Sequence, residues 1–347
     1  MILNLKFVPF IVPISCANLC NGAKMKHIFI VNPVAGRGSV QRKLIQDLEK
    51  RSLDFYITKG AYDATKYVKA MCESYPNETI RFYACGGDGT LNEVVNGAFG
   101  ADNAEIGAVP AGSGNDFIRN FDVPRENFAN LDKQMLGSAT YVDVVRFTEV
   151  FANSKEDSLV DSIGNLNDNK RTHEYAINMF NIGFDCNVVV QMLKVKKYPF
   201  LRGSLAYMIS ILITLIKKEG ANVIVEFDDG TSYDGHVLLT AIGNGCFCGG
   251  GLKGVPHAHV ANGHMDICLI KDVPRRTIIS LLSKFADGSY LEVSELQKHI
   301  TYKKCKSVVI ERNENNRNLC VDGEVKTMNK KIFEVVPNAV KFSIPSL

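Results

Sequence analysis

The sequence has no tryptophan, no Cys-x-x-Cys pair and no Gly-x-x-x-x-Gly-Lys-Ser/Thr loop. The absence of tryptophan weakly disfavours a carbohydrate-binding surface. Ten cysteines are scattered along the chain, several of them in apolar runs, which favours reduced thiols in a cytosolic protein over a disulfide framework. The absence of the Gly-Lys-Ser/Thr loop means that phosphate groups are not held in the Walker manner.

Neither sign of charge is in excess, because 40 basic residues stand against 37 acidic ones. This balance argues against nucleic acid as the main partner. The first 24 residues are apolar, but Pro9 and Pro13 interrupt them, and a membrane helix needs about 20 apolar residues in succession. We therefore predict a poorly ordered extension over residues 1–24. A true start at Met25 or a weak membrane anchor are the alternatives.

Glycine is abundant, and three of the 28 glycines form the turn Gly86-Gly87-Asp88-Gly89. A buried strand is predicted before it, over residues 81–85, and a helix after it, over residues 91–96. Glycine lets a bulky anion approach the backbone N–H groups, and the helix N-terminus adds positive partial charge. Asp88 would repel a phosphate unless a cation lies between them or Asp88 accepts a proton. The turn therefore predicts a phosphoryl-transfer site, with a structural turn capped by Asp88 as the alternative.

Two other predicted strands end in glycine turns. The strand over residues 27–31 leads into Asn32–Gly38, and the strand over residues 106–110 leads into Ala111–Phe117. Open α/β sheets bind ligands at the carboxyl ends of their strands. Residues 25–139 are therefore predicted to form a doubly wound nucleotide-binding α/β domain. In the third turn, Asn115 and Asp116 could instead cap a helix.

The second half of the chain has closely spaced strand patterns and few long helical ones. The 347 residues allow two cored domains, and these patterns predict an antiparallel β-sandwich over residues 140–325. A polar insert over residues 148–172 is predicted to be a solvated or disordered loop, and residues 326–347 to pack on either domain.

An apolar helix is predicted over residues 204–216, with lysines or arginines on both sides of it. At 1.5 Å per residue its length is about 20 Å, which is too short to span a bilayer. Packing over the β domain is the first expectation. Contact with an anionic membrane surface is the alternative.

The motif Asp322-Gly323-Glu324 places two carboxylates around a glycine. One carboxylate could orient a cation while the other accepts a proton from a hydroxyl group. A surface Asp-Gly hairpin turn is the alternative.

Four motifs resemble the diacylglycerol kinase catalytic domain family, which includes sphingosine kinases and bacterial soluble lipid kinases. They are Asn32-Pro33-Val34-Ala35-Gly36, Gly86-Gly87-Asp88-Gly89-Thr90-Leu91-Asn92-Glu93, Pro110–Phe117 and Asp322-Gly323-Glu324. NAD kinases share the Gly-Gly-Asp-Gly core, and the Pro110–Phe117 motif separates the two groups. The resemblance implies transfer of the ATP γ-phosphoryl group, with Mg²⁺, to a lipid alcohol.

The resemblance also implies roles for individual residues. Glu324 is expected to act as the base, with Asp322 beside it, and Asp88 to act at the phosphates. Mg²⁺ is expected on Asp88 and Asp116 through ATP. The residues expected to contact the nucleotide are Asn32, Pro33, Val34, Ala35, Gly36, Thr58, Gly86, Gly87, Asp88, Gly89, Thr90, Leu91, Asn92, Ser113 and Asp116.

A structural magnesium site is a further implication of the resemblance, over residues 244–270. Its ligand positions correspond to His259, Asn262 and His264. The family has an aspartate where this chain has Asn262, and the missing carboxylate weakens a site for a hard cation.

Diacylglycerol is the leading acceptor, with sphingoid bases, ceramide and polyprenols as alternatives. A cytoplasmic protein is expected, in peripheral contact with the membrane, with no nucleic-acid partner and with a homodimer as one option. An NAD kinase and a non-catalytic nucleotide or lipid sensor are the rival functions.

Overall fold

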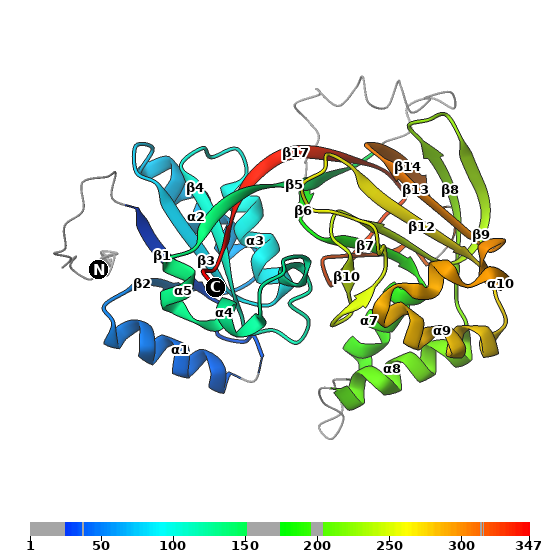
Figure 1. Ribbon diagram of the computed structural model, residues 1–347, viewed down its shortest axis with the longest axis horizontal. Coiled ribbons are helices and arrows are strands. Elements are labelled where there is room, and N and C mark those ends of the chain that lie inside the picture. Colours follow the sequence, from blue (N-terminus) through cyan, green and yellow to red (C-terminus); the bar gives the residue numbers. More distant parts are fainter. Residues whose placement is uncertain (1–24, 37, 151–173, 196–203, 313, 315) are drawn as a thin grey trace, which may run out of the picture.

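The computed structural model describes residues 25–36, 38–150, 174–195, 204–312, 314 and 316–347. These residues form an α/β half and a β half, which lie side by side (Figure 1). The predicted extension 1–24 and most of the predicted insert 148–172 lie outside the described residues.

The α/β half is built on a parallel sheet in the order β2-β1-β3-β4. Its strands are β1 (Lys26–Val31), β2 (Asp54–Ile57), β3 (Ile80–Gly86) and β4 (Ala104–Pro110). Every residue of β3 is buried, as expected for a central strand with helices on both faces.

Helices cover both faces of this sheet, so the predicted doubly wound α/β fold is confirmed. Successive side chains of β1 point to opposite faces: Phe29 and Val31 pack with Leu48 of α1 (Ser39–Lys50). Ile28 and Ile30 pack on the other side with α2 (Asp63–Ser74) and α3 (Asp88–Ala98). Figure 1 shows α1 below the sheet and α2 and α3 above it.

The β half is antiparallel, which confirms the predicted β-sandwich region. Its sheet runs in the order β16-β15-β7-β9-β8-β14-β17, with β12 and β13 extending it from β9 and with β5 and β6 beside β17. The strands are β5 (Ser138–Glu149), β6 (Glu174–Ala176), β7 (Met179–Gly183), β8 (Ala221–Phe227), β9 (Ser232–Gly243), β12 (Met265–Lys271), β13 (Ile300–Cys305), β14 (Ser307–Glu311), β15 (Asn318–Val321), β16 (Glu324–Thr327) and β17 (Lys330–Ile344).

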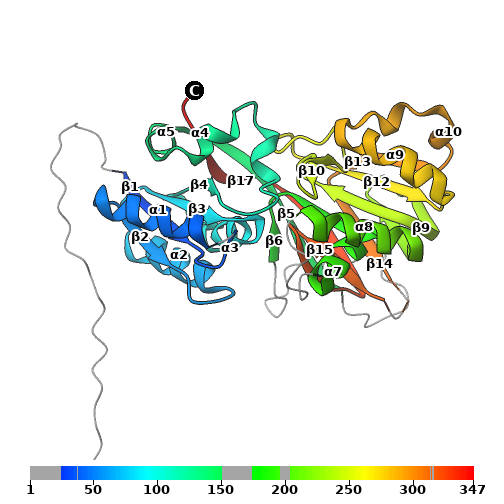
Figure 2. The ribbon, with the colours of Figure 1, turned by 90° about the horizontal axis from the view of Figure 1, so that it is seen from below.

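Helices cover one side of the β half (Figures 1 and 2). They are α7 (Phe184–Val195), α8 (Ser204–Lys217), α9 (Arg275–Asp287), η3 (Ser289–Glu292) and α10 (Ser294–Gln297). A short hairpin of β10 (Phe247–Cys248) and β11 (Leu252–Lys253) projects toward the α/β half. No helix within the described ranges is long and apolar enough to cross a membrane.

Two long strands, β5 and β17, belong to both halves. They pair with each other from Glu149↔Lys331 to Ser138↔Ile344, and the far end of β17 pairs with β4. In the chain, the segment between β4 and β5 contains η1 (Phe117–Asn120), α4 (Arg125–Ala129) and α5 (Leu131–Met135). Because one strand pair serves both sheets, the two halves are joined by continuous backbone hydrogen bonding. The domain boundaries at residues 139 and 325 stay a prediction.

The β17 strand is irregular between Val336 and Val340, where its register with β5 shifts. Asn338 has a φ of 51°, and its N–H donates to the buried Asp143 Oδ1 at 2.8 Å. The other oxygen of Asp143 accepts from Gly263 N at 2.7 Å. A carboxylate of β5 thus fixes the bend at which β17 passes from one sheet to the other.

Candidate active site

The three predicted glycine turns pack against one another at one edge of the parallel sheet. A Cβ on Gly112 would lie 2.5 Å from the Gly87 Cα, and a Cβ on Gly36 would lie 2.4 Å from the Ala111 carbonyl oxygen. Such contacts are too short for any side chain, so glycine is required for the turns to meet. Their packing brings the backbone of three strand ends to one place.

Polar side chains tie the first turn to the second. Asn32 Nδ2 donates to Thr90 Oγ1 at 3.0 Å, and the Asn32 backbone N–H donates to the Cys85 carbonyl at 3.1 Å. Thr58, at the end of β2, lies beside them, since its N–H donates to the Val31 carbonyl at 2.9 Å. Four strand ends therefore meet here.

Asp88 joins the second turn to the third. It is the first residue of α3, which therefore begins three residues before the predicted start at Leu91. Its Oδ1 accepts from Asp116 N at 2.7 Å and its Oδ2 from Asn115 N at 2.8 Å. Burial raises the pKa of Asp88, and these N–H donors oppose that rise.

Asp116 lies close to Asp88, and a Cβ on Gly114 would be 2.8 Å from Asp88 Oδ2 and 3.1 Å from Asp116 Oδ2. Both oxygens of Asp116 accept from Gly250 N at 3.0 Å, and Arg119 Nε lies 3.4 Å from Oδ1. Burial and then the charge of Asp88 raise the pKa of Asp116 to about 6. The Asp116 side chain caps no helix, so the capping alternative is wrong for this residue.

The predicted Asp-Gly turn is a hairpin turn between β15 and β16, with φ of 46° at Asp322 and 89° at Gly323. Positive φ at both positions is typical of a type I′ turn. Asp322 is nevertheless buried. Its oxygens accept from the backbone N–H groups of residues 177, 178 and 179 at 2.8 to 3.1 Å and from Asn92 Nδ2 at 2.9 Å. With four donors, Asp322 fixes the hairpin against α3.

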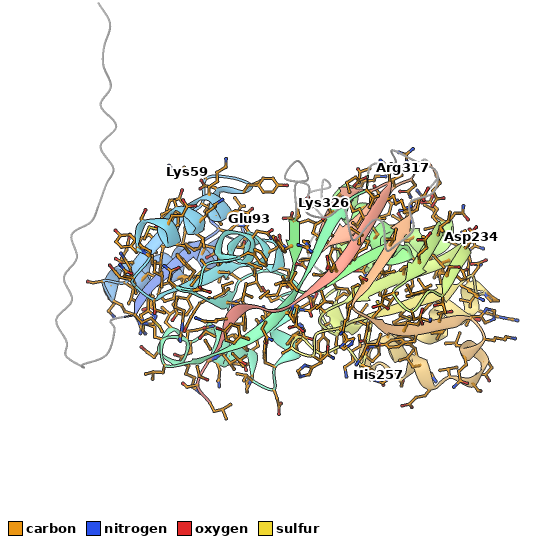
Figure 3. All side chains as sticks on the ribbon, turned by 90° about the horizontal axis from the view of Figure 1, so that it is seen from above. Lys59, Glu93, Asp234, His257, Arg317 and Lys326 are labelled. Atoms are coloured by element: carbon orange, nitrogen blue, oxygen red, sulfur yellow. The ribbon has the colours of Figure 1, made fainter. Side chains whose placement is uncertain are left out.

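Glu324 follows this turn and extends over the N-terminus of α3. Its Oε1 would lie 2.6 Å from a Cβ on Gly89. Its side chain stays exposed, and its pKa is raised by partial burial of the carboxyl group and then by the charges of Glu93 and Asp322. In Figure 3, Glu93 and Lys326 mark the two sides of this junction between the halves.

Three predicted nucleotide residues have distinct surroundings. Ser113 is exposed at the tip of the third turn, and Val34 is 83% exposed in the first. Leu91 is 4% exposed and belongs to the core between α3 and the sheet, so only its backbone is open to a ligand role. A cavity of about 10 Å³, lined by Gly87, Asp88 and Phe117 among others, is large enough for about one water molecule.

Several amides that hold the site together were not predicted from the sequence. Asn178 Nδ2 donates to the Phe247 carbonyl at 2.8 Å, and Asn120 Oδ1 accepts from Cys246 N at 2.7 Å. Asn244 Nδ2 donates to the carbonyls of Asp143 and Ile177, both at 2.8 Å. The bond of Asn120, the last residue of η1, links the segment after the third glycine turn to the β half, and the bonds of Asn178 and Asn244 lie within the β half. Their only signal in the sequence is the placement of Asn residues at strand and helix ends.

The residues of the expected structural magnesium site are engaged with their own loop. Asn262 Oδ1 accepts from His264 N at 3.0 Å, and His264 Nδ1 lies 2.9 Å from the Asn262 carbonyl. His259 Nδ1 accepts from Ala261 N at 3.2 Å. In the part of the chain that the structure describes, no three His, Cys, Asp or Glu side chains are grouped to hold a metal ion. The expected structural magnesium site at His259, Asn262 and His264 stays a prediction.

The acidic pair Asp88 and Asp116 is a different case. Carboxylate oxygens are the ligands that Mg²⁺ prefers, and Mg²⁺ usually shares them with water and substrate phosphates. Burial and then the like charge of Asp88 raise the pKa of Asp116, and a divalent cation would relieve the repulsion between the two carboxylates. These two residues fit a phosphate-bound cation.

A larger cavity, of about 250 Å³, lies elsewhere on the β half and is lined by His257, Leu291, Gln297, Ile300 and Tyr302. Figure 3 shows His257 well away from Glu93, which marks the site. The larger cavity therefore does not identify the candidate active site. The site is identified by the glycine turns and carboxylates that converge at the N-terminus of α3.

Residues 26–147 match the family described as "Diacylglycerol kinase catalytic domain", and residues 179–344 match the "YegS C-terminal NAD kinase beta sandwich-like domain". A relative from Bacillus subtilis (strain 168) named "Diacylglycerol kinase" is 28% identical over 302 residues, which are 85% of this chain and 88% of the relative. A crystal structure of a diacylglycerol kinase from Bacillus anthracis str. Sterne aligns over 91% of this chain and 96% of its own with a TM-score of 0.59 and 21% identity, which shows a shared fold.

Proposed function

Because this chain belongs to the diacylglycerol kinase catalytic domain family, we propose that it transfers the γ-phosphoryl group of ATP to a lipid alcohol, with diacylglycerol as the acceptor. The family supports a phosphotransferase, and two relatives from Bacillus subtilis are named "Diacylglycerol kinase" and "Putative lipid kinase YtlR". The observation that carries the proposal is the approach of Glu324, from the β half, to Gly89 in the second of the three glycine turns of the α/β half.

Nucleotide binding is supported by the backbone of these turns. The turns meet through backbone atoms at Gly36, Gly87 and Gly112, and α3 directs its N-terminus to the same place. Backbone N–H groups at a helix N-terminus favour phosphate oxygens. Asp88 and Asp116 would hold Mg²⁺ when ATP is bound, and the metal would neutralise charge on the transferring phosphoryl group.

Glu324 is proposed as the general base. Its exposed carboxylate can reach a hydroxyl group brought to the α3 N-terminus, and its raised pKa improves its match to an alcohol proton. In the proposed step the acceptor oxygen forms a bond to the γ-phosphorus, the bond from that phosphorus to the β,γ-bridging oxygen breaks, and ADP leaves. The hydroxyl proton passes to a Glu324 carboxylate oxygen.

Asp322 is proposed as a positioning residue, since four donors already occupy its carboxylate. It ties the hairpin that carries Glu324 to Asn92 of α3. A residue that orients the base in this way affects turnover more than substrate binding.

The test is phosphoryl transfer from labelled ATP with Mg²⁺ to a panel of lipid alcohols, using purified protein. We expect phosphatidic acid from diacylglycerol, and we expect Glu324→Gln to fold normally and to lose turnover. Glu295→Gln is the matched control, because Glu295 is exposed on α10, at the far end of the β half from α3 (Figure 1), and this variant should keep wild-type turnover. Phosphorylation of NAD without any lipid product would instead support an NAD kinase.

The proposal includes the cellular setting. A protein that acts on a membrane lipid from the cytoplasm must meet the bilayer at its surface, and we propose peripheral membrane association. Retention of the protein on isolated membranes, and its release by high salt, would support this setting.

A further inference from the structure

Helices α7, α8 and α9 present aliphatic side chains away from the sheet that they cover. Leu193 is 53% exposed, Leu212 56%, Ile216 65% and Ile279 56%. Single exposed apolar residues are normal on a protein surface, but these four belong to one layer of helices. Figure 1 shows that layer along the lower side of the β half, and Figure 2 views this side directly.

The polarity of α8 is inverted relative to a usual surface helix. Ser210 and Thr214 point inward and are 0% and 1% exposed, while Leu212 and Ile216 point outward. The Thr214 hydroxyl donates to the Ser210 carbonyl at 2.8 Å, so it needs no water. Surface helices of globular proteins normally turn their polar residues to solvent. This arrangement suits a helix whose outer face contacts an apolar phase.

Helix α7 shares one feature with α8, because it buries polar side chains and exposes a leucine. Asn187 and Gln191 are buried, at 5% and 8% exposure, whereas Leu193 is exposed. Asn187 Nδ2 donates to the Glu219 carbonyl at 3.1 Å, which places the amide in the contact between α7 and the end of α8. On α7 these amides lie beside the buried Phe184, Cys186, Val188 and Val195, so its inner face is mixed, and both helices leave a leucine exposed.

The junction of α8 and α9 is fixed by Arg275. Its guanidinium donates to the Leu215 carbonyl at 3.1 Å and to the Ile216 carbonyl at 2.8 Å. These hydrogen bonds join the last turn of α8 to the first residue of α9. Ile279, one turn farther along α9, is thereby held at a set position relative to Ile216.

Cations accompany these aliphatic side chains. Arg276 lies one turn before Ile279, and Lys194 follows Leu193; both cations are exposed and have no ion-pair partner among the residues described. Lys217 is partly neutralised, because Glu219 lies 3.7 Å away. Exposed aliphatic groups beside unpaired cations match a surface with an apolar interior and anionic head groups.

We propose that this helical face, defined by Leu193, Leu212, Ile216 and Ile279, is the surface on which the protein docks to an anionic lipid bilayer. The inference rests on the proposed function, because a diacylglycerol acceptor resides in the bilayer. Helix α1, which follows the first glycine turn, lies on the same lower side of the molecule in Figure 1. Docking by the helical face therefore turns the side of the molecule that carries α1 toward the membrane.

The test is sedimentation of the full-length protein with vesicles of equimolar phosphatidylcholine and phosphatidylglycerol, without nucleotide. The double variant Leu212→Ser/Ile216→Ser is expected to partition at least about tenfold more weakly, because two inserted aliphatic side chains are lost. Leu136→Ser is the matched control, since Leu136 is 77% exposed but lies in the α/β half, and it should bind as the wild type does. Arg276→Gln should weaken binding to these vesicles and leave binding to phosphatidylcholine vesicles unchanged.

Other outcomes would overturn docking by this face. They are no vesicle binding by the wild type, equal weakening by Leu136→Ser, or a wild-type dimer that the double variant converts to a monomer while neither binds vesicles. Turnover of a dissolved short-chain diacylglycerol separates this inference from the proposed function. If the double variant loses vesicle binding but still phosphorylates the dissolved diacylglycerol, both the docking face and the proposed function are supported. If the wild type binds vesicles but phosphorylates no lipid, only the proposed function is refuted.

Discussion

Replacing Asp116 by asparagine should stabilise the fold while removing phosphoryl transfer. The pKa of Asp116 is raised from 3.8 to about 6 by burial and by Asp88. Below pH 3.8 the carboxyl is protonated in both the folded and the unfolded chain. Between pH 3.8 and about 6 the unfolded chain ionises first, so the wild type loses stability as the pH rises through this window.

The size of the loss follows from the shift. Two pKa units correspond to about 3 kcal/mol of unfolding free energy at neutral pH. Asparagine avoids this cost but keeps only one oxygen to accept from Gly250 N, which now bonds both oxygens at 3.0 Å. A weaker hydrogen bond costs about 1 to 2 kcal/mol, so the variant should be more stable by about 1 to 2 kcal/mol above pH 6.

Urea unfolding of wild type and Asp116→Asn on both sides of this pH window measures the difference. We expect the gain to appear as the pH rises and to vanish in acid. Addition of Mg²⁺ should stabilise the wild type and have a smaller effect on the variant. A variant less stable than the wild type at every pH, with the wild-type pH dependence unchanged, would refute the reasoning.

Three further substitutions test the packing of the site. Gly89→Ala puts a Cβ 2.6 Å from Glu324 Oε1, the end of a flexible side chain, so we expect a normal melting temperature and at least about tenfold slower turnover. Gly112→Ala puts a Cβ 2.5 Å from the backbone of Gly87, so it should lower the free energy of unfolding by about 2 kcal/mol and weaken ATP binding in calorimetric titration. Gly60→Ala is its control, because a Cβ there meets open space and should change neither the stability nor the ATP binding. Asn92→Ala removes the bonds to Asp322 and to the Tyr175 carbonyl, both at 2.9 Å, and should cost about 2 kcal/mol in denaturant unfolding; an unchanged midpoint would show that the hairpin does not depend on α3.

The α/β half could be predicted because its signals are local. The strands β1, β3 and β4 are short apolar runs that are each followed by a glycine turn, and the carboxyl ends of parallel strands share one sheet edge. The contacts of Gly36, Gly87 and Gly112 follow from this geometry. The start of α3 was less certain, because Asp88 and Gly89 are poor helix formers in isolation and only the packing of the turn makes them helical.

The β half could be predicted only as a class. The approach of Glu324 to Gly89 joins residues far apart in the sequence, and no local pattern specifies it. The same holds for β17, whose first part pairs with β14 and whose last part pairs with β4. The inverted polarity of α8 was also hidden, because an apolar helix does not reveal which of its faces will meet the protein.

The buried carboxylates show why residue roles are harder to predict than positions. Asp322 and Glu324 are two residues apart, yet one accepts four hydrogen bonds and the other is exposed. Asp322 lies in the turn and bonds to the backbone of residues 177–179, whereas Glu324 is the first residue of β16. Sequence alone gave both residues as candidates for chemistry.

The most direct measurement is the mass of the product formed from labelled ATP, Mg²⁺ and diacylglycerol by the wild type, Asp88→Asn and Glu324→Gln. The central prediction is that the wild type forms phosphatidic acid and the two variants form none, while all three proteins fold alike. Phosphatidic acid formed at the wild-type rate by both variants would contradict it.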